Sequence, residues 1–157
     1  MPMKIGDPRP SFEGATEWLN ELQETADDYA TGQPTLVYFW ATSCEICKQK
    51  FPQLRELLGR YRSSGLRSVA VHMPRYESDT DLEKVKASIA EHCIDDVCAI
   101  DNKHQLRQAF LNEQGWVPVY YLFDAEGKLK TRAAGEFGLG IIEQALTKMF
   151  GAQQAAA

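Results

Sequence analysis

The chain has 157 residues, four of them cysteines, with 44% hydrophobic residues, 25% charged residues and a formal net charge of −5. This negative charge argues against a nucleic-acid surface, and no apolar run approaches the roughly 18 residues needed to cross a membrane. Four cysteines are also too few for a disulfide scaffold. We expect a monomer with one domain over residues 1–157 and without nucleic-acid or membrane partners.

Residues 1–34 form an N-terminal extension ahead of the first long apolar run. Prolines punctuate residues 6–12, which favours an extended chain. Residues 17–20 are expected to form a short strand or a turn of helix, and residues 20–30 are compatible with a helix. Glycine and proline at residues 32–34 then break this segment.

The most informative stretch is an apolar strand that runs directly into a helix. Residues 35–41 are mostly apolar or aromatic and rich in β formers, as in a strand buried on both faces. Over residues 45–62 the apolar side chains recur at roughly helical spacing, and Pro52 predicts a kink inside this helix. A Cys-x-x-Cys pair, Cys44 and Cys47, stands at the junction of the two elements.

The position of this pair predicts reactive sulfur chemistry. The first turn of a helix has free N–H groups and a positive dipole end, so the thiol pKa of Cys44 is expected below the ~8.5 of a free cysteine. Cys47 lies one turn deeper, where it can close a disulfide. We therefore expect Cys44 to be the exposed nucleophile and Cys47 the resolving thiol of a reversible pair. Half of a zinc site and two inert core cysteines are the alternatives.

A second strand is expected over residues 66–73, so residues 35–73 form a βαβ unit with two parallel strands. His72 falls near the carboxyl end of this second strand. A substrate-side or metal-binding imidazole is one interpretation of His72, but we favour a hydrogen-bonded histidine at a strand end.

Helices and a short strand alternate through the middle of the chain. We expect a helix over about residues 80–92 with Asp79 or Thr80 as its cap, a strand over residues 97–100, and a helix over about residues 103–112.

Two further cysteines, Cys93 and Cys98, flank the turn before that short strand. They can form a second disulfide, or complete a four-thiolate zinc site with Cys44 and Cys47. We expect instead that each is a small buried hydrophobic residue.

The last third of the chain predicts a β-hairpin and a closing helix. A run of β formers follows Pro118, at a position where proline costs no ladder hydrogen bond. Residues 124–127 carry a hairpin-turn signal, and residues 128–135 are the expected antiparallel partner. An amphipathic helix is expected over residues 139–149, and residues 151–157 are expected to form a disordered tail of small residues.

The segment Phe-Trp-Ala-Thr-Ser-Cys-Glu-Ile-Cys-Lys at residues 39–48, followed by Phe51 and Pro52, resembles the active-site segment of thioredoxin-fold proteins. It is most similar to the TlpA-like and ResA-like thiol–disulfide oxidoreductases. A Gly-Asp-x-x-Pro-x-Phe opening and a strand–Asp-x-x-Gly–strand–Gly-Glu pattern extend the resemblance over residues 5–150. The resemblance implies an α/β, thioredoxin-like fold: a mixed central sheet flanked by helices, with an N-terminal extension and a helix–strand insertion.

The resemblance also implies roles for individual residues. The Val117–Pro118 bond is expected to be cis and to face the cysteine pair, with Val117 holding the backbone of a bound substrate. Trp40 is expected to support the active-site loop and to contribute to substrate binding. The disulfide is then the redox group, without a cofactor or a metal. The partners are a protein disulfide and an unidentified dithiol electron donor.

Three positions depart from the pattern of the family. Tyr38 stands where thioredoxins have a buried Asp, and Lys50 where ResA-like proteins have a Glu, so two proton acceptors near Cys47 are missing. Ser43 replaces the usual Trp before the first cysteine. Glu45 is either a substitute in proton transfer or a solvated acid of the first helical turn. Lys48 and Lys50 are expected to add positive potential, which favours thiolates and makes the disulfide more oxidising.

The function expected from the sequence is the reduction of protein disulfides through the Cys44–Cys47 dithiol and a mixed disulfide. A peroxidase of the peroxiredoxin type is one alternative, although Ala41 stands where that family has a Thr. A zinc-binding module, and a thioredoxin-fold scaffold or chaperone with incidental cysteines, are the others. Residues 1–4 lack an apolar signal core, so we expect a cytoplasmic protein; if a leader has been removed, the protein works outside the cytoplasm.

Overall fold

The computed structural model describes residues 1–151, which are arranged around one six-stranded sheet. The strands lie in the order β1-β4-β3-β2-β5-β6. Strands β2, β3 and β4 run parallel, whereas β1 pairs with β4, β5 with β2 and β6 with β5 in antiparallel fashion. The expected mixed sheet is therefore confirmed, with the strands β1 (Glu17–Leu19), β2 (Thr35–Trp40), β3 (Arg67–His72), β4 (Val97–Ile100), β5 (Val119–Phe123) and β6 (Leu129–Ala134).

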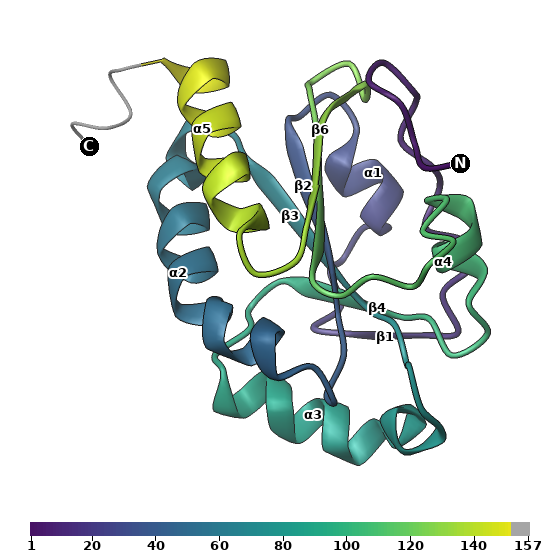
Figure 1. Cartoon of the computed structure of the whole chain (residues 1–157). Helices are drawn as coiled ribbons and strands as arrows, with labels where there is room; N and C mark the ends of the chain where they lie inside the picture. The colour runs from purple at the N-terminus through teal and green to yellow at the C-terminus, as the bar shows by residue number, and fades with distance from the viewer. Residues whose placement is uncertain (152–157) are drawn as a thin grey trace.

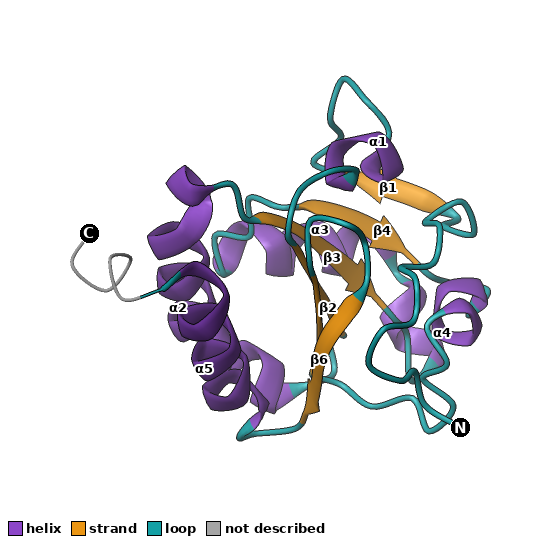
Figure 2. Ribbon diagram, turned by 90° about the horizontal axis from the view of Figure 1, so that it is seen from above, coloured by secondary structure: helices purple, strands orange, loops and turns teal. Residues whose placement is uncertain are grey.

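Helices cover both faces of this sheet (Figures 1 and 2). Helices α2, α3 and α5 pack on one face and α1 and α4 on the other, and each face has its own cluster of buried apolar side chains. No helix within residues 1–151 has both the length and the apolar character needed to cross a bilayer. The helices are α1 (Ala26–Ala30), α2 (Glu45–Tyr61), α3 (Leu82–Glu91), α4 (Gln105–Ala109) and α5 (Gly138–Phe150), with the 3₁₀ turns η1 (Arg62–Ser64) and η2 (Glu77–Thr80).

The central pair of strands decides where the functional residues meet. All six residues of β2 are at most 2% exposed, as expected of a strand covered on both faces. In the parallel register Thr35 pairs with Arg67 and Trp40 with His72, so β2 and β3 end level with one another. The loops that follow these two strands therefore lie at the same edge of the sheet, the edge where open α/β sheets place their sites.

Three predicted helices differ from the observed ones. The segment at residues 20–30 is helical only in α1, because β1 pairs with β4 and Asn20 then turns the chain at φ 53°. Helix α4 is shorter than expected, since Leu111 takes a left-handed conformation at φ 53°. Helix α3 is capped by Asp81, which accepts a hydrogen bond from the backbone of Glu83, and not by the expected Asp79 or Thr80.

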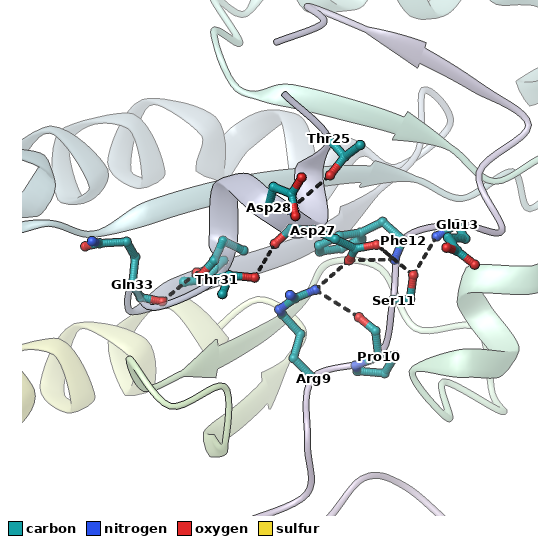
Figure 3. Close-up of polar contacts among 12 residues, drawn as sticks. Arg9, Pro10, Ser11, Phe12, Glu13, Thr25, Asp27, Asp28, Thr31 and Gln33 are labelled. Carbon is teal, nitrogen blue, oxygen red and sulfur yellow. Dashed lines mark hydrogen bonds and ion pairs between the residues drawn. The ribbon is translucent and has the colours of Figure 1, made fainter. Parts of the chain in front are cut away.

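Within the N-terminal extension, one carboxylate fastens residues 9–12 to α1 (Figure 3). Asp27 accepts hydrogen bonds from the Arg9 guanidinium at 3.0 Å, the Ser11 hydroxyl at 2.7 Å and the Phe12 N–H at 3.1 Å. Phe12 is thereby held with its ring in the core, 1% exposed. Partial burial alone would raise the pKa of Asp27, but these hydrogen bonds outweigh it and lower the pKa below its ordinary value.

The tail expected at residues 151–157 starts at the residue that follows α5. Gly151 donates its N–H to the Thr147 carbonyl at 2.8 Å and so closes α5. Residues 152–157 lie outside the described residues.

Candidate active site

The cysteine pair lies where the buried strand β2 gives way to α2, as expected. Cys44 is the N-cap of α2, and its sulfur accepts a hydrogen bond from the Cys47 N–H at 3.1 Å. The two cysteines form a disulfide, with their Cα atoms 5.3 Å apart. Both sulfurs therefore lie at the positive end of the helix dipole, where a thiolate is stabilised.

The expected exposure of Cys44 is wrong for this oxidised state. Cys44 and Cys47 are each 3% exposed and belong to the same core cluster. The reason is geometric: the Cys44 sulfur turns inward onto Cys47 and the first turn of α2, away from solvent. Within the motif, Ile46 is the exposed apolar side chain, at 38%.

The peptide bond between Val117 and Pro118 is cis, and it opens strand β5. Val117 is partly exposed and packs against the core cluster that contains both cysteines. Pro118 is buried, and its carbonyl accepts the Gly135 N–H at 2.9 Å, which ties it to the turn before α5. Val117 is thus the member of this pair that has surface available to a partner.

Trp40 supports the site from below and does not reach its surface. Its ring is completely buried, with ring centroids 5.5 Å from Phe51 of α2 and 4.7 Å from His72 of β3. The expected contribution of Trp40 to substrate binding is therefore wrong. Since the last residue of a doubly covered strand points into a core, the large ring packs the base of the active-site loop instead.

Tyr38 does not replace the proton acceptor that the family has at this position. Its hydroxyl donates to the buried carboxylate of Asp96 at 2.6 Å, and the same carboxylate is bound by Ser68 and Arg62. Burial, together with the Asp96 charge, raises the pKa of Tyr38 well above its ordinary value. At neutral pH the phenol therefore stays protonated and remains hydrogen-bonded to Asp96.

Glu45 and Lys50 do not form a buried proton relay. The Glu45 side chain is 78% exposed and lies 3.9 Å from Lys48, so Glu45 is the solvated acid of the first helical turn. Lys50 is half-buried on α2, and its effect on the thiols stays a prediction.

His72 is a hydrogen-bonded histidine at a strand end, the interpretation favoured from the sequence. The side chain is completely buried, and Nε2 accepts the Thr42 N–H at 3.1 Å. Burial lowers the pKa of His72 to about 4, against a smaller opposing effect of the Asp79 charge. The imidazole is therefore neutral near pH 7 and holds the backbone two residues before Cys44.

Sequence reasoning missed two residues that contact the active-site loop, Arg75 and Asp79. Asp79 is 2% exposed and binds the hydroxyls of Thr42 and Ser43, while Arg75 donates to Ser43. A signal for both exists in the sequence: they follow the strand parallel to β2, and loops after neighbouring parallel strands meet.

The other two cysteines are not part of the site, and they differ from one another. Cys98 is completely buried in β4, as expected, and burial raises its pKa to about 12. Cys93 is an exposed free thiol, so the expectation of burial is wrong there; at φ 55° it turns the chain after α3. Within residues 1–151 no three histidine, cysteine or acidic side chains are grouped to hold a metal ion, which argues against the four-thiolate zinc site.

Comparison with known proteins agrees with this geometry. Residues 5–132 match the AhpC/TSA family. The chain is 40% identical over 147 residues to the thiol-disulfide oxidoreductase YkuV of Bacillus subtilis, a match that covers 94% of this chain and 97% of that protein. It is 25% identical over 139 residues to the thiol-disulfide oxidoreductase ResA of Bacillus cereus, covering 85% of this chain and 72% of ResA.

A solved structure shows the same architecture. The solution structure of a thioredoxin-like protein in the oxidised form superposes with a TM-score of 0.82 at 38% identity, covering 94% of this chain and 97% of that one. The expected thioredoxin-like fold and its likeness to ResA are thus confirmed. The chain belongs to the AhpC/TSA family and is a thioredoxin-like thiol–disulfide oxidoreductase.

Proposed function

We propose that the protein reduces disulfides of partner proteins through the Cys44–Cys47 dithiol. The observation that carries this proposal is the placement of Cys44 as the N-cap of α2, within disulfide reach of Cys47. A sulfur that accepts the Cys47 N–H as a thiolate gains a hydrogen bond and the favourable end of the helix dipole. These effects favour the ionised, attacking form of Cys44.

The reaction consists of two exchanges at sulfur. The Cys44 thiolate attacks one sulfur of the partner disulfide; a Cys44–partner bond forms, the partner S–S bond breaks, and one partner thiolate leaves. Cys47 then attacks Cys44, the mixed disulfide breaks, and the second partner sulfur leaves with the proton that Cys47 gives up. The dithiol has lost two electrons and the partner has gained them. An external dithiol restores the reduced pair by the same exchange in reverse.

The surface at Val117 supports a protein as the partner. We propose that an extended partner segment lies along the cis Val117–Pro118 peptide, where Val117 is partly exposed beside the cysteine cluster. We further propose that the reaction needs no cofactor beyond the Cys44–Cys47 couple, and that the protein works in a compartment that supplies a dithiol reductant.

Cysteine variants test the proposal. Cys44→Ser is expected to abolish the reduction of insulin disulfides, because no thiolate remains at the helix N-terminus. Cys47→Ser is expected to accumulate a mixed disulfide with the substrate, visible by mass spectrometry, because the resolving thiol is missing. Cys93→Ser is the matched control, since it removes the exposed free thiol and is expected to keep wild-type activity. Activity that survives Cys44→Ser would contradict the proposal.

A peroxidase function is not favoured. Ala41 is completely buried and offers no hydroxyl three residues before Cys44, where the peroxiredoxin family has its Thr. The relatives at 40% and 25% identity are both named thiol-disulfide oxidoreductases.

A further inference from the structure

The chain just before Cys44 is held from a neighbouring loop by an arginine. Arg75 follows β3, and its Nη2 donates to the Ser43 carbonyl at 2.8 Å while its Nε donates to the Ser43 hydroxyl at 3.2 Å. The Ser43 carbonyl carbon is bonded to the Cys44 nitrogen. The guanidinium is therefore fixed one peptide group away from the nucleophile.

Beneath this contact, the buried carboxylate of Asp79 orients both the loop that follows β2 and the loop that follows β3. Asp79 accepts the Thr42 hydroxyl at 3.0 Å, the Ser43 hydroxyl at 2.7 Å, the Arg75 N–H at 2.9 Å and the Tyr76 N–H at 3.3 Å. Burial alone would raise the pKa of Asp79, but these four donors outweigh it and lower the pKa. We call Arg75 and Asp79 together the Arg75–Asp79 bracket.

The bracket follows from the level ends of β2 and β3. The Met73 N–H donates to the Trp40 carbonyl at 2.8 Å, so the two loops leave the sheet side by side. Arg75 is exposed, and its guanidinium also lies over the Tyr76 ring, 5.5 Å from the centroid. Two hydrogen bonds and a ring contact restrict a side chain that would otherwise move freely in solvent.

Several charged groups near Cys44 act together with Arg75. Asp79 receives hydrogen bonds from four neutral donors, so it keeps its negative charge, and this charge offsets part of the positive effect of Arg75; no ion pair joins the two residues within residues 1–151. Glu45 and Lys48 lie together in the first turn of α2 and offset each other, and the buried His72 is neutral near pH 7. Lys50, one turn further along α2, is half-buried and adds positive charge.

We propose that Arg75 is a positioning residue for the thiol–disulfide exchange: it fixes the Ser43–Cys44 peptide and places a guanidinium where it stabilises the Cys44 thiolate. This inference rests on the proposed role of Cys44 as the attacking thiol. The buried Asp79 carboxylate holds the Arg75 backbone and the loop at Thr42 in fixed positions relative to one another.

The test compares Arg75→Gln, Arg75→Lys and the control Arg55→Gln, all in a Cys93→Ser background. Arg55 is a second exposed arginine that donates to a backbone carbonyl, that of His92 at 2.9 Å. Thiolate formation at Cys44 is followed by its ultraviolet absorbance during a pH titration. The rate of reaction of the reduced protein with dithiodipyridine, a small disulfide that needs no docking surface, is measured by stopped flow.

Arg75→Gln is expected to raise the measured pKa of Cys44 by about 0.5 to 1 unit, the size of a screened effect of one nearby charge. Below that pKa the variant should react about two- to threefold more slowly than wild type, because fewer molecules carry the thiolate. Above it the variant should react about two- to threefold faster, because a more basic thiolate is the better nucleophile. Arg75→Lys should stay close to wild type in the titration, and Arg55→Gln should match it throughout.

The crossing of the two rate profiles distinguishes electrostatic positioning from a merely structural role. A structural role would slow Arg75→Gln at both ends of the pH range, and an unchanged titration would overturn the inference while leaving the proposed function intact. If Cys44→Ser reacts with dithiodipyridine as fast as the wild type in the same background, Cys44 is not the attacking thiol and the proposed function itself fails. Thermal unfolding of each variant confirms that the compared proteins are folded.

Discussion

At the scale of single residues, His72 links the stability of the protein to pH. Its pKa falls from an ordinary 6.5 to about 4 in the folded chain, so between these values the unfolded chain binds a proton that the folded chain refuses. The free energy of unfolding therefore decreases as the pH falls through this window. Asp79 and Asp27, whose pKa values are lowered, add their own losses only below their ordinary value of 3.8.

His72→Gln is expected to remove this loss. The glutamine oxygen can still accept the Thr42 N–H, but the side chain does not titrate. On lowering the pH from 7.5 to 5.0, wild type should lose about 2 kcal/mol more of its unfolding free energy than the variant, from roughly 1.4 kcal/mol per pKa unit. Urea unfolding at both pH values measures the difference. If both proteins lose the same amount of unfolding free energy, His72 takes up its proton in the folded protein at no cost to stability, which contradicts this account.

Residues defined by local pattern are predictable from the sequence, and residues defined by distant partners are not. Cys44 and Cys47 follow from a strand, a helix and a three-residue spacing. Arg75 does not, because its partner Ser43 lies 32 positions earlier and only the register of two strands brings them together. Tyr38 shows the same limit. The sequence identifies its place in the central strand, but its hydrogen bond to Asp96, 58 positions later, depends on the tertiary structure.

At the scale of elements, the short helix α1 holds its place through side-chain contacts. Five residues give too few helical hydrogen bonds for a stable isolated helix, so its surroundings must supply the rest. Thr25 caps the helix by accepting the Asp28 N–H at 3.1 Å, and Asp27 joins it to residues 9–12 (Figure 3). A cavity of about 530 Å³, bordered by Phe12 and Trp18, lies beside α1.

Asp27→Asn is expected to lower the free energy of unfolding by about 1 to 2 kcal/mol at pH 7, because charged acceptors are replaced by an amide that can satisfy fewer of the three donors. Asp28→Asn is the matched control: it removes a charge from the same helical turn, but Asp28 receives none of those three hydrogen bonds. Urea unfolding of both variants measures the effect. Because folding lowers the pKa of Asp27, the loss should shrink as the pH falls below 3.8, and a pH-independent loss would contradict this account.

Element types were predictable wherever the hydrophobic period was long, and boundaries failed where a turn intervened. The strands at β2 and β4 and the long helix α2 agree closely with the sequence pattern. The helices predicted over residues 20–30 and 103–112 are longer than the observed α1 and α4. Left-handed residues such as Asn20 and Leu111 end a segment without the glycine or proline that usually marks a segment boundary in the sequence.

At the scale of the whole molecule, one sheet shares its strands between two cores. Side chains alternate along β4, so Cys98 belongs to the cluster under α2 and α5 while its neighbour Ala99 belongs to the cluster under α1 and α4. Cys98 is paired on both sides, with Ala70 of β3 and Leu19 of β1. Exposing its sulfur therefore requires the core under α2 and α5 and the two flanking strand ladders to open.

Thiol labelling of the oxidised protein measures this coupling. Cys93 is exposed and should react at once, whereas Cys98, completely buried and with its pKa raised to about 12, should react only through opening of the sheet. The opening free energy obtained from the slow phase should equal the global free energy of unfolding in urea. Cys93→Ser should remove the fast phase and leave the slow phase unchanged. An opening free energy several kcal/mol below the global value would show instead that β1 and β4 detach as a local unit, because β1 is only three residues long and lies at the edge of the sheet.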